Sequence, residues 1–289
     1  GELGLDESAH ALFEAYGAEQ TRFVKSAYLQ ALKELDVTPY LDALRERYQQ
    51  LLAYESSEDE KKHVAQERSL FQQLLSENDV LKKHTFSGWR RTNDVIFTTE
   101  YALREPLQKQ IEMRSREAVR TALHPFGVRV RTTELSQLSR MHTYRELLFT
   151  LRIRGTVRGN AAELSRALLD GGLITLLEEL HAETTPFYFR IEVRGMEDTV
   201  QKTALAKELA LELEQGSGGR LFNSTTDYEV ELRLMRTKDG SFYPCLKLYT
   251  IADDRFAWRK QTISASMHPS LAAALIELAR PYLSEQAVV

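Results

Sequence analysis

Cysteine is almost missing from this sequence: Cys245 is the single example among 289 residues. One cysteine can form neither an internal disulfide nor a paired CxxC metal site. Its neighbours Tyr243, Pro244, Leu246 and Leu248 belong to an apolar segment. We therefore expect Cys245 to be an inert, partly buried thiol.

Long hydrophobic runs are also missing. No segment approaches the roughly 18–20 consecutive apolar residues that span a bilayer. The first seven residues, 1–7, carry three acids and no base, unlike a signal peptide with its basic and then apolar regions. We expect a cytoplasmic protein, in which the Asn223-Ser224-Thr225 sequon is a chance match because glycosylation requires secretion.

The usual catalytic motifs are absent as well. The sequence has no HExxH, no GxSxG and no P-loop, and its seven histidines are scattered. The glycine-rich stretch 216–219 follows a helical pattern and precedes a strand pattern, which is typical of a helix C-terminal cap. A phosphate-binding loop would instead precede a helix. Asp253-Asp254 is followed at once by Arg255 and is best explained as a solvated turn. We expect no catalytic residue, metal site or cofactor site on this chain.

Charge is distributed unevenly. Residues 84–160 contain 14 Lys and Arg against 7 Asp and Glu, whereas the flanking segments 1–83 and 161–289 are both acidic, and the whole chain carries a formal charge of −4. A basic block inside an acidic protein indicates a surface for a polyanion. Arginine stems that lie over packed helices are an equally good explanation when the charge is considered alone.

Residues 1–83 have the pattern of helices only. Apolar residues recur at helical spacing, as in Tyr28, Leu32 and Leu35, and Pro39 suits the first turn of a helix. Antiparallel helices joined by short breaks are typical of helical repeats. We therefore predict an all-α, HEAT-repeat-like segment, which resembles the end of a repeat array.

Residues 84–160 alternate between strand and helix patterns and predict a small basic α/β unit of ferredoxin-like type. Strands are expected at 94–99, 128–132 and 151–154, and helices at 105–123 and 135–149. In the second and third strands every other residue is arginine, which places the basic side chains outward on exposed strand faces. These residues are Arg129, Arg131, Arg152 and Arg154. Their regular placement favours polyanion binding over arginine stems lying on helices.

Residues 161–262 predict a second α+β unit. The expected elements are a helical pair at 161–181 broken at Gly171-Gly172, a strand at 187–195, a helix at 199–214 and a hairpin of 228–234 with 245–249. Residues 263–289 then predict a linker helix that begins near His268-Pro269. The final Val288-Val289 has the pattern of another strand, so we expect the chain to stop where a further domain begins.

The segment Phe189-Arg190-Ile191-Glu192-Val193-Arg194-Gly195, the following Ala/Leu-rich helix and Asn223 to Leu232 resemble the THUMP domain of RNA-modifying enzymes. The stretches 247–249, 255–260 and 265–275 are similar to the segment that joins THUMP to an S-adenosylmethionine-dependent methyltransferase domain. The resemblance covers residues 160–289 well and 84–160 loosely. The helical segment 1–83 departs from the usual pattern and leaves the subfamily open.

This resemblance implies that the chain binds structured RNA, tRNA or rRNA, by shape and phosphate contacts. It implies a catalytic domain, absent here, that uses S-adenosylmethionine to methylate RNA, with guanosine N2 as one target. Further RNA contacts are implied at Arg190, Arg194, Arg233 and Lys247. A solvated sheet face paired to Glu192, Glu229 and Glu231 is an equal alternative for these four.

The basic-aromatic connector contributes three more predicted RNA contacts, at Arg255, Arg259 and Lys260, which are interleaved with Phe256 and Trp258. The main competing hypothesis is a protein-interaction scaffold that uses the helical segment 1–83 and has no role in RNA modification. RNA affinity that falls steeply with salt would separate the two, because only phosphate contacts release counterions.

Overall fold

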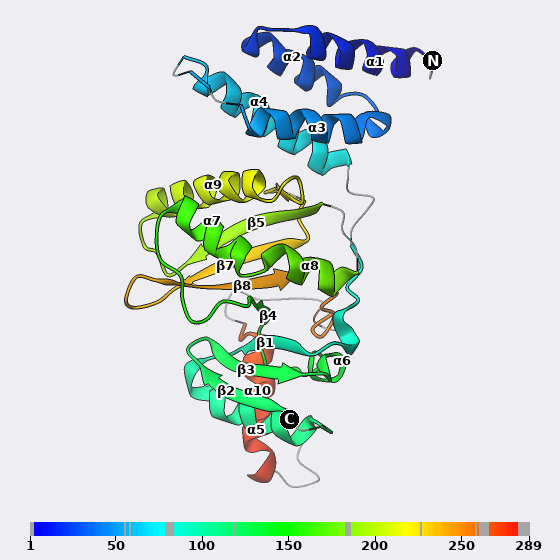
Figure 1. The fold of residues 1–289 in the computed structure, drawn as a ribbon. Helices are drawn as coiled ribbons and strands as arrows, with labels where there is room; N and C mark the ends of the chain where they lie inside the picture. The colour runs from blue at the N-terminus through cyan, green and yellow to red at the C-terminus, as the bar shows by residue number, and fades with distance from the viewer. Residues whose placement is uncertain are drawn as a thin grey trace.

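The computed structural model describes residues 3–54, 56–57, 59–78, 84–117, 119–182, 186–225, 227–257, 259 and 266–282. The molecule is elongated, with a helical unit at one end and two α/β parts below it (Figure 1). None of the described helices combines the length and hydropathy that are needed to cross a bilayer.

The helical unit is built as the sequence predicts, from helices alone in the described part of residues 1–83. Its members are α1 (Leu3–Ala18), α2 (Arg22–Leu32), η1 (Thr38–Tyr40), α3 (Leu41–Leu52) and α4 (Lys61–Asn78). They enclose a core in which Leu29, Tyr48 and Phe71 are fully buried and which also includes Phe222 from the sheet. Whether these helices belong to a HEAT-type repeat stays a prediction.

One eight-stranded sheet runs through the rest of the molecule. The strands are β1 (Asn93–Thr98), β2 (Arg120–His124), β3 (Gly127–Thr132), β4 (Leu147–Thr150), β5 (Phe187–Arg194), β6 (Leu221–Asn223), β7 (Val230–Arg236) and β8 (Phe242–Leu248). Their order is β2-β3-β1-β4-β8-β7-β5-β6. β5 pairs in parallel with β6 and β7, and the other neighbours are antiparallel. The sheet is therefore mixed, and the fold of this part is α+β.

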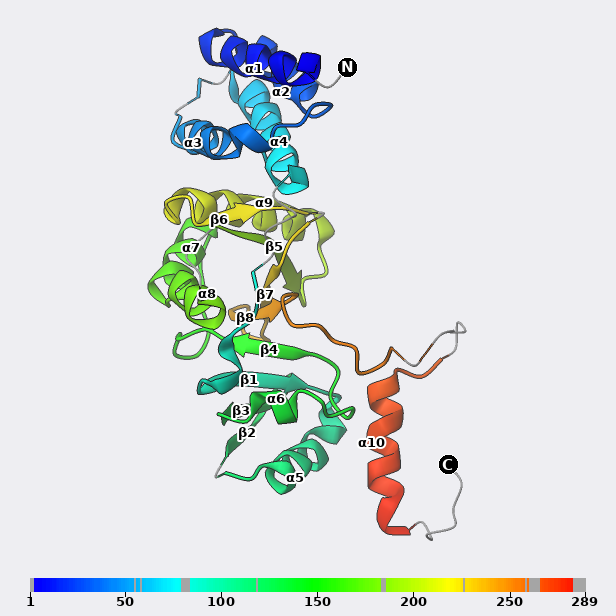
Figure 2. The same ribbon diagram turned by 90° about the vertical axis from the view of Figure 1, so that its right-hand side faces the viewer.

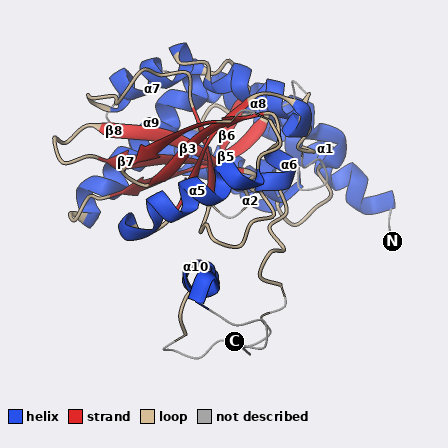
Figure 3. Cartoon of the chain, turned by 90° about the horizontal axis from the view of Figure 1, so that it is seen from below, coloured by secondary structure: helices blue, strands red, loops and turns tan. Residues whose placement is uncertain are grey.

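The helices that accompany the sheet are η3 (Gly88–Arg90), η4 (Tyr101–Leu103), α5 (Arg104–Arg114), α6 (Leu135–Leu138), α7 (Ala161–Asp170), α8 (Leu173–His181), α9 (Thr199–Gly216), α10 (Pro269–Ala279) and η5 (Arg280–Tyr282). One continuous core joins α5 to α9 with one face of the strands and includes Phe97, Leu177 and Leu232. Figures 2 and 3 show α10 away from α7 and α8, and α10 contacts α5.

Strand β4 joins the two α/β parts. It pairs with β1 on one side and with β8 on the other, where Phe149 lies opposite Leu246 and Thr150 opposite Cys245. Its residues are apolar on both faces because a central strand is covered on both. The backbone bridge between Val157 and Phe242 adds a second connection.

Several predicted elements match the structure. The strand predicted at 94–99, the helical pair broken at Gly171-Gly172, the strand at 187–195, the helix at 199–214 and the hairpin all form near the expected residues. The turn at Gly172 has a positive φ of 78°, which glycine adopts without strain. Residues 288–289, the predicted final strand, lie outside the described residues.

Three predicted elements in the basic unit were wrong. The helix predicted at 105–123 ends at Arg114, and 120–124 forms β2 because it pairs along its whole length with β3. The helix predicted at 135–149 is limited to Leu135–Leu138. Residues 147–150, the apolar end of that predicted helix, instead form the central strand β4. Residues 151–154, which were predicted as a strand, come directly after β4 and are not part of a strand. For β2 and β4, tertiary pairing overrides local helix propensity.

Candidate nucleic-acid interface

The four arginines that the alternating pattern singled out converge on one groove. Arg129 and Arg131 extend from β3, and Arg152 and Arg154 follow β4. All four line a cavity of about 650 Å³ between β1, β3 and helix α8. All four are exposed, and for Arg129 and Arg131, which lie in a strand, this agrees with the predicted outward direction of alternate side chains.

The groove also includes Arg91, which was not among the predicted RNA contacts. Its guanidinium Nη1 donates a hydrogen bond of 2.6 Å to the carbonyl of Glu179 on α8. The groove therefore collects five guanidinium groups against two carboxylates, those of Asp94 and Glu179. The adjacent pair Arg90-Arg91 inside the basic block was the available signal for this residue.

Three of the groove arginines form ion pairs at the surface, and the longest joins Arg91 Nη1 to Glu179 Oε2 at 3.9 Å. Arg129 donates hydrogen bonds to both carboxylate oxygens of Asp94, with Nε–Oδ1 2.8 Å and Nη2–Oδ2 2.6 Å. This pairing raises the pKa of Arg129. Arg152 Nη2 lies 2.6 Å from Glu179 Oε2. An exposed pair with a single contact, such as that of Arg152, contributes about 0–1 kcal/mol, so a phosphate can compete for its guanidinium. The pair of Arg129 with both oxygens of Asp94 is stronger.

The remaining groove arginines, Arg131 and Arg154, form no salt bridge with the described residues. Arg131 lies directly opposite Arg120 across the β2–β3 pair. Like charges directly opposite one another in a sheet are destabilising. A second cavity of about 340 Å³ is lined by both arginines together with Glu117 and Glu134, so its charges balance. Arg120 was missed because its segment was expected to be helical.

The second predicted set, Arg190, Arg194, Arg233 and Lys247, lies in an ion-pair network with Glu146, Glu192 and Glu231. Arg233 is 1% exposed, with Nε 2.8 Å from Glu231 Oε1 and Nη1 2.6 Å from Glu146 Oε2. Arg190 Nε donates to Glu231 at 2.9 Å, and Lys247 Nζ lies 3.1 Å from Glu146.

The electrostatics of this network are dominated by mutual pairing. Burial alone would raise the pKa of Glu146, but hydrogen bonds and charge from Arg233 and Lys247 hold it at about 2. Arg194 is exposed and only loosely paired, 3.5 Å from Glu146. The prediction that Arg233 contacts RNA directly is corrected, because its guanidinium is enclosed between two carboxylates. Arg190, Arg194 and Lys247 keep accessible surface and stay predicted contacts. Glu229, which was expected in this network, pairs instead with His84.

The connector residues have different surroundings. Arg255 is 8% exposed and donates to the carbonyls of Met141, Tyr144 and Arg145 while it pairs with Asp253. Its guanidinium therefore joins the connector to the loop before β4, which corrects the prediction of a direct RNA contact. Arg259 donates to the carbonyl of Met267 at 2.9 Å and is half-buried. Lys260 and Trp258 lie outside the described residues.

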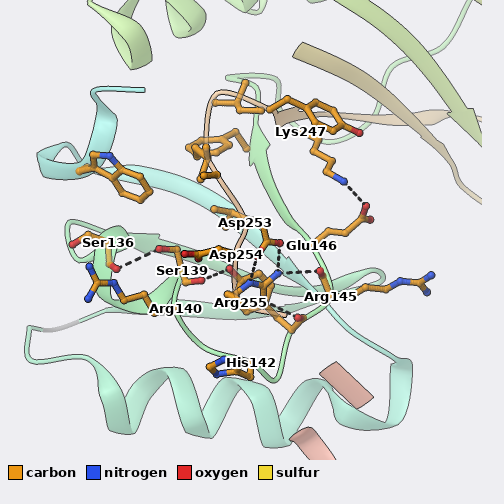
Figure 4. Close-up of a pocket in the computed structure, with 18 residues that line it drawn as sticks. Ser136, Ser139, Arg140, His142, Arg145, Glu146, Lys247, Asp253, Asp254 and Arg255 are labelled. Atoms are coloured by element: carbon orange, nitrogen blue, oxygen red, sulfur yellow. Dashed lines mark hydrogen bonds and ion pairs between the residues drawn. The ribbon is translucent and has the colours of Figure 1, made fainter. Parts of the chain in front are cut away.

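A cavity of about 1050 Å³ lies where this connector passes the loop between α6 and β4 (Figure 4). Arg140, Arg145, Lys247 and Arg255 line it together with Glu146, Asp253 and Asp254, so its charges nearly balance. Within the part of the chain that the structure describes, no three His, Cys, Asp or Glu side chains form a group that could hold a metal ion. The arginine groove is the more strongly cationic of the two surfaces.

Comparison with known proteins gives structural similarity only. No protein-family model and no curated protein matches the chain. Among solved structures it is similar to TrmN from Thermus thermophilus, with 18% identity and a TM-score of 0.42 over 65% of this chain and 54% of that one. PH1313 from Pyrococcus horikoshii Ot3 has 10% identity and a TM-score of 0.36, over 54% of this chain and 55% of that one.

A third similar structure is a 4-thiouridine synthetase in complex with RNA and ATP. It has 12% identity and a TM-score of 0.34, over 54% of this chain and 40% of that one. The chain spans about half the length of TrmN and PH1313. These TM-scores indicate a partial likeness of fold.

Proposed function

We propose that this chain binds structured RNA through the arginine-lined groove and positions it for a modifying enzyme. The observation that carries the proposal is the groove with its five guanidinium groups and two carboxylates. Arg131 and Arg154 form no salt bridge with the described residues, and planar guanidinium groups match phosphate oxygens in geometry. Phosphate contacts of this kind fix the register of an RNA without reading its sequence.

The direct test is the affinity of the chain for bulk tRNA between about 50 and 200 mM salt. Each neutralised phosphate should make log K fall with log salt by a slope of about 0.7–0.9. Charge reversal by Arg131→Glu or Arg154→Glu should weaken binding and reduce that slope. Arg166→Glu is the matched control, because Arg166 is an exposed arginine on α7 outside the groove. Equal losses in all three variants would show a non-specific charge effect and contradict the proposal.

We further propose that the modification is methylation and that guanosine N2 is one target. Under this proposal S-adenosylmethionine binds to a separate catalytic domain, and this chain only supplies the RNA. The support is the resemblance of residues 189–195 and 223–232 to THUMP enzymes. Saturable binding of labelled S-adenosylmethionine by this chain would contradict the division of roles.

A second candidate function is protein interaction through the helical unit. Residues 1–83 carry a formal charge of −6, so this end of the molecule repels RNA and has a role separate from the groove. Phe23 on α2 is 66% exposed there, packed edge-on against His63. Absence of any salt-dependent RNA affinity would favour this scaffold function over the groove.

A further inference from the structure

Tyr101 has an exposure that packing does not explain. It lies in η4, and its side chain is 77% exposed. The guanidinium carbon of Arg104 lies 3.6 Å from the centre of its ring. Arg104 is itself fixed, because Nη1 donates a 3.0 Å hydrogen bond to the carbonyl of His124. The structure therefore holds a large aromatic ring in solvent with a cation stacked upon it.

His124, whose carbonyl accepts the hydrogen bond from Arg104, belongs to a group of three further rings. His124 ends β2, Phe126 lies in the turn that follows, and Tyr243 comes from β8. The ring centres of His124 and Tyr243 are 4.5 Å apart, those of His124 and Phe126 5.3 Å, and those of Phe126 and Tyr243 6.4 Å. All three side chains keep part of their surface in solvent.

This contact joins distant parts of the sheet. Three strands separate β2 from β8 in the sheet order, so the sheet must curl strongly for their rings to meet. The curled face encloses Ile96, Leu148 and Cys245, which are fully buried although none of the described helices contributes to their cluster.

The rings also lie next to the arginine groove. His124 lies opposite Gly127 in the β2–β3 pair, and Arg129, a groove residue, is two positions from Gly127 on the same face of β3. The charge of Arg129 acts to lower the pKa of both His124 and Tyr243, but burial raises the pKa of Tyr243 overall. Burial is the largest cause for His124, and its pKa falls to about 4. His124 therefore presents a neutral ring near pH 7. We name Tyr101, Arg104, His124, Phe126 and Tyr243 the aromatic strip.

We propose that the aromatic strip stacks unpaired bases of an RNA whose paired part lies in the arginine groove. Any base can stack on an aromatic ring, and arginine adds a cation–π contribution. Rings beside a phosphate-binding groove suit the junction between a duplex and a single strand, where bases are free to stack. The inference depends on the proposed RNA-binding function and adds to it the kind of RNA that fits.

Fluorescence anisotropy on two labelled RNAs tests this inference. One is a blunt hairpin, and the other is the same hairpin with a short unpaired extension. The extended RNA should bind more tightly, and Tyr101→Ala should weaken its binding by about five- to 150-fold, the range for one stacked base. Tyr101→Ala should leave the blunt hairpin and the salt slope unchanged, because no phosphate contact is removed. Tyr101→Phe should keep the preference.

Phe23→Ala is the matched control, because Phe23 is also an exposed ring but lies on the helical unit. Equal affinity for the two RNAs, or an equal loss for Tyr101→Ala and Phe23→Ala, would overturn the stacking proposal while leaving groove binding intact. Arg131→Glu should instead weaken both RNAs alike. If the wild-type chain binds neither RNA, the groove proposal fails and the stacking proposal fails with it.

Discussion

Glu214 on α9 lies between the helical unit and the sheet, and its buried carboxylate offers a test of how the two are held together. The side chain is 1% exposed. Tyr48 from α3 donates its hydroxyl to Oε2 at 2.8 Å, Gln72 from α4 donates its amide at 3.2 Å, and the backbone N–H of Asn223 donates to Oε1 at 2.7 Å. Three elements from two units therefore meet at one carboxyl group.

Burial raises the pKa of Glu214 to about 7, although Asn223, Tyr48, Gln72 and the charge of Arg68 all act to lower it. An unfolded glutamate titrates near 4.5. Between these pH values the folded state binds more protons than the unfolded state, so the free energy of unfolding falls as pH rises. The difference between the two pKa values corresponds to about 3 kcal/mol lost between roughly pH 4.5 and 7.

Glu214→Gln should remove this pH dependence, because the amide keeps the shape and an acceptor oxygen but does not titrate. We expect wild-type stability from urea denaturation, followed by circular dichroism, to fall between pH 5 and pH 8 more steeply than that of the variant. Glu212→Gln on the same helix is the control, because Glu212 is partly exposed. The reasoning is refuted if wild type and Glu214→Gln lose the same stability over this range.

Three further predictions concern stability and reactivity. Glu146→Gln leaves the buried guanidinium of Arg233 with one carboxylate fewer, and urea unfolding at pH 7 should show a loss of about 1–3 kcal/mol. Gly127→Ala should cost more than about 1 kcal/mol in the same assay, because the new Cβ would lie 2.0 Å from the Phe97 carbonyl oxygen. Cys245 is fully buried, and burial raises the pKa of its thiol to about 12. A disulfide reagent at pH 8 should react with it only after unfolding, and rapid reaction in buffer would contradict this.

The elements that the sequence predicts well are those with local causes. The β7–β8 hairpin follows from alternation and from the turn at Gly240, where φ is +81°. The outward direction of Arg129 and Arg131 follows from the same period of two. For these residues, neighbours along the chain are sufficient to specify the conformation.

The elements that the sequence predicts badly depend on distant partners. β2 and β4 have helix-forming neighbours and become strands only because β3, β1 and β8 supply their hydrogen bonds. Arg233 has the alternation of a surface residue, but Glu146, 87 positions away, encloses it. Arg255 is likewise buried by backbone carbonyls 110 to 114 positions earlier. No local pattern carries that information.

The sheet that continues through β4 has a mechanical consequence. Arg129 and Arg131 come from one α/β part and Glu179 from the other, so the groove straddles the join. Backbone hydrogen bonds cross this join, so the two sides of the groove cannot move apart by a hinge motion without breaking these bonds. An RNA in the groove would meet a template of fixed width. Whether a duplex binds would then depend on its own diameter and bend, because the groove would not widen to fit it.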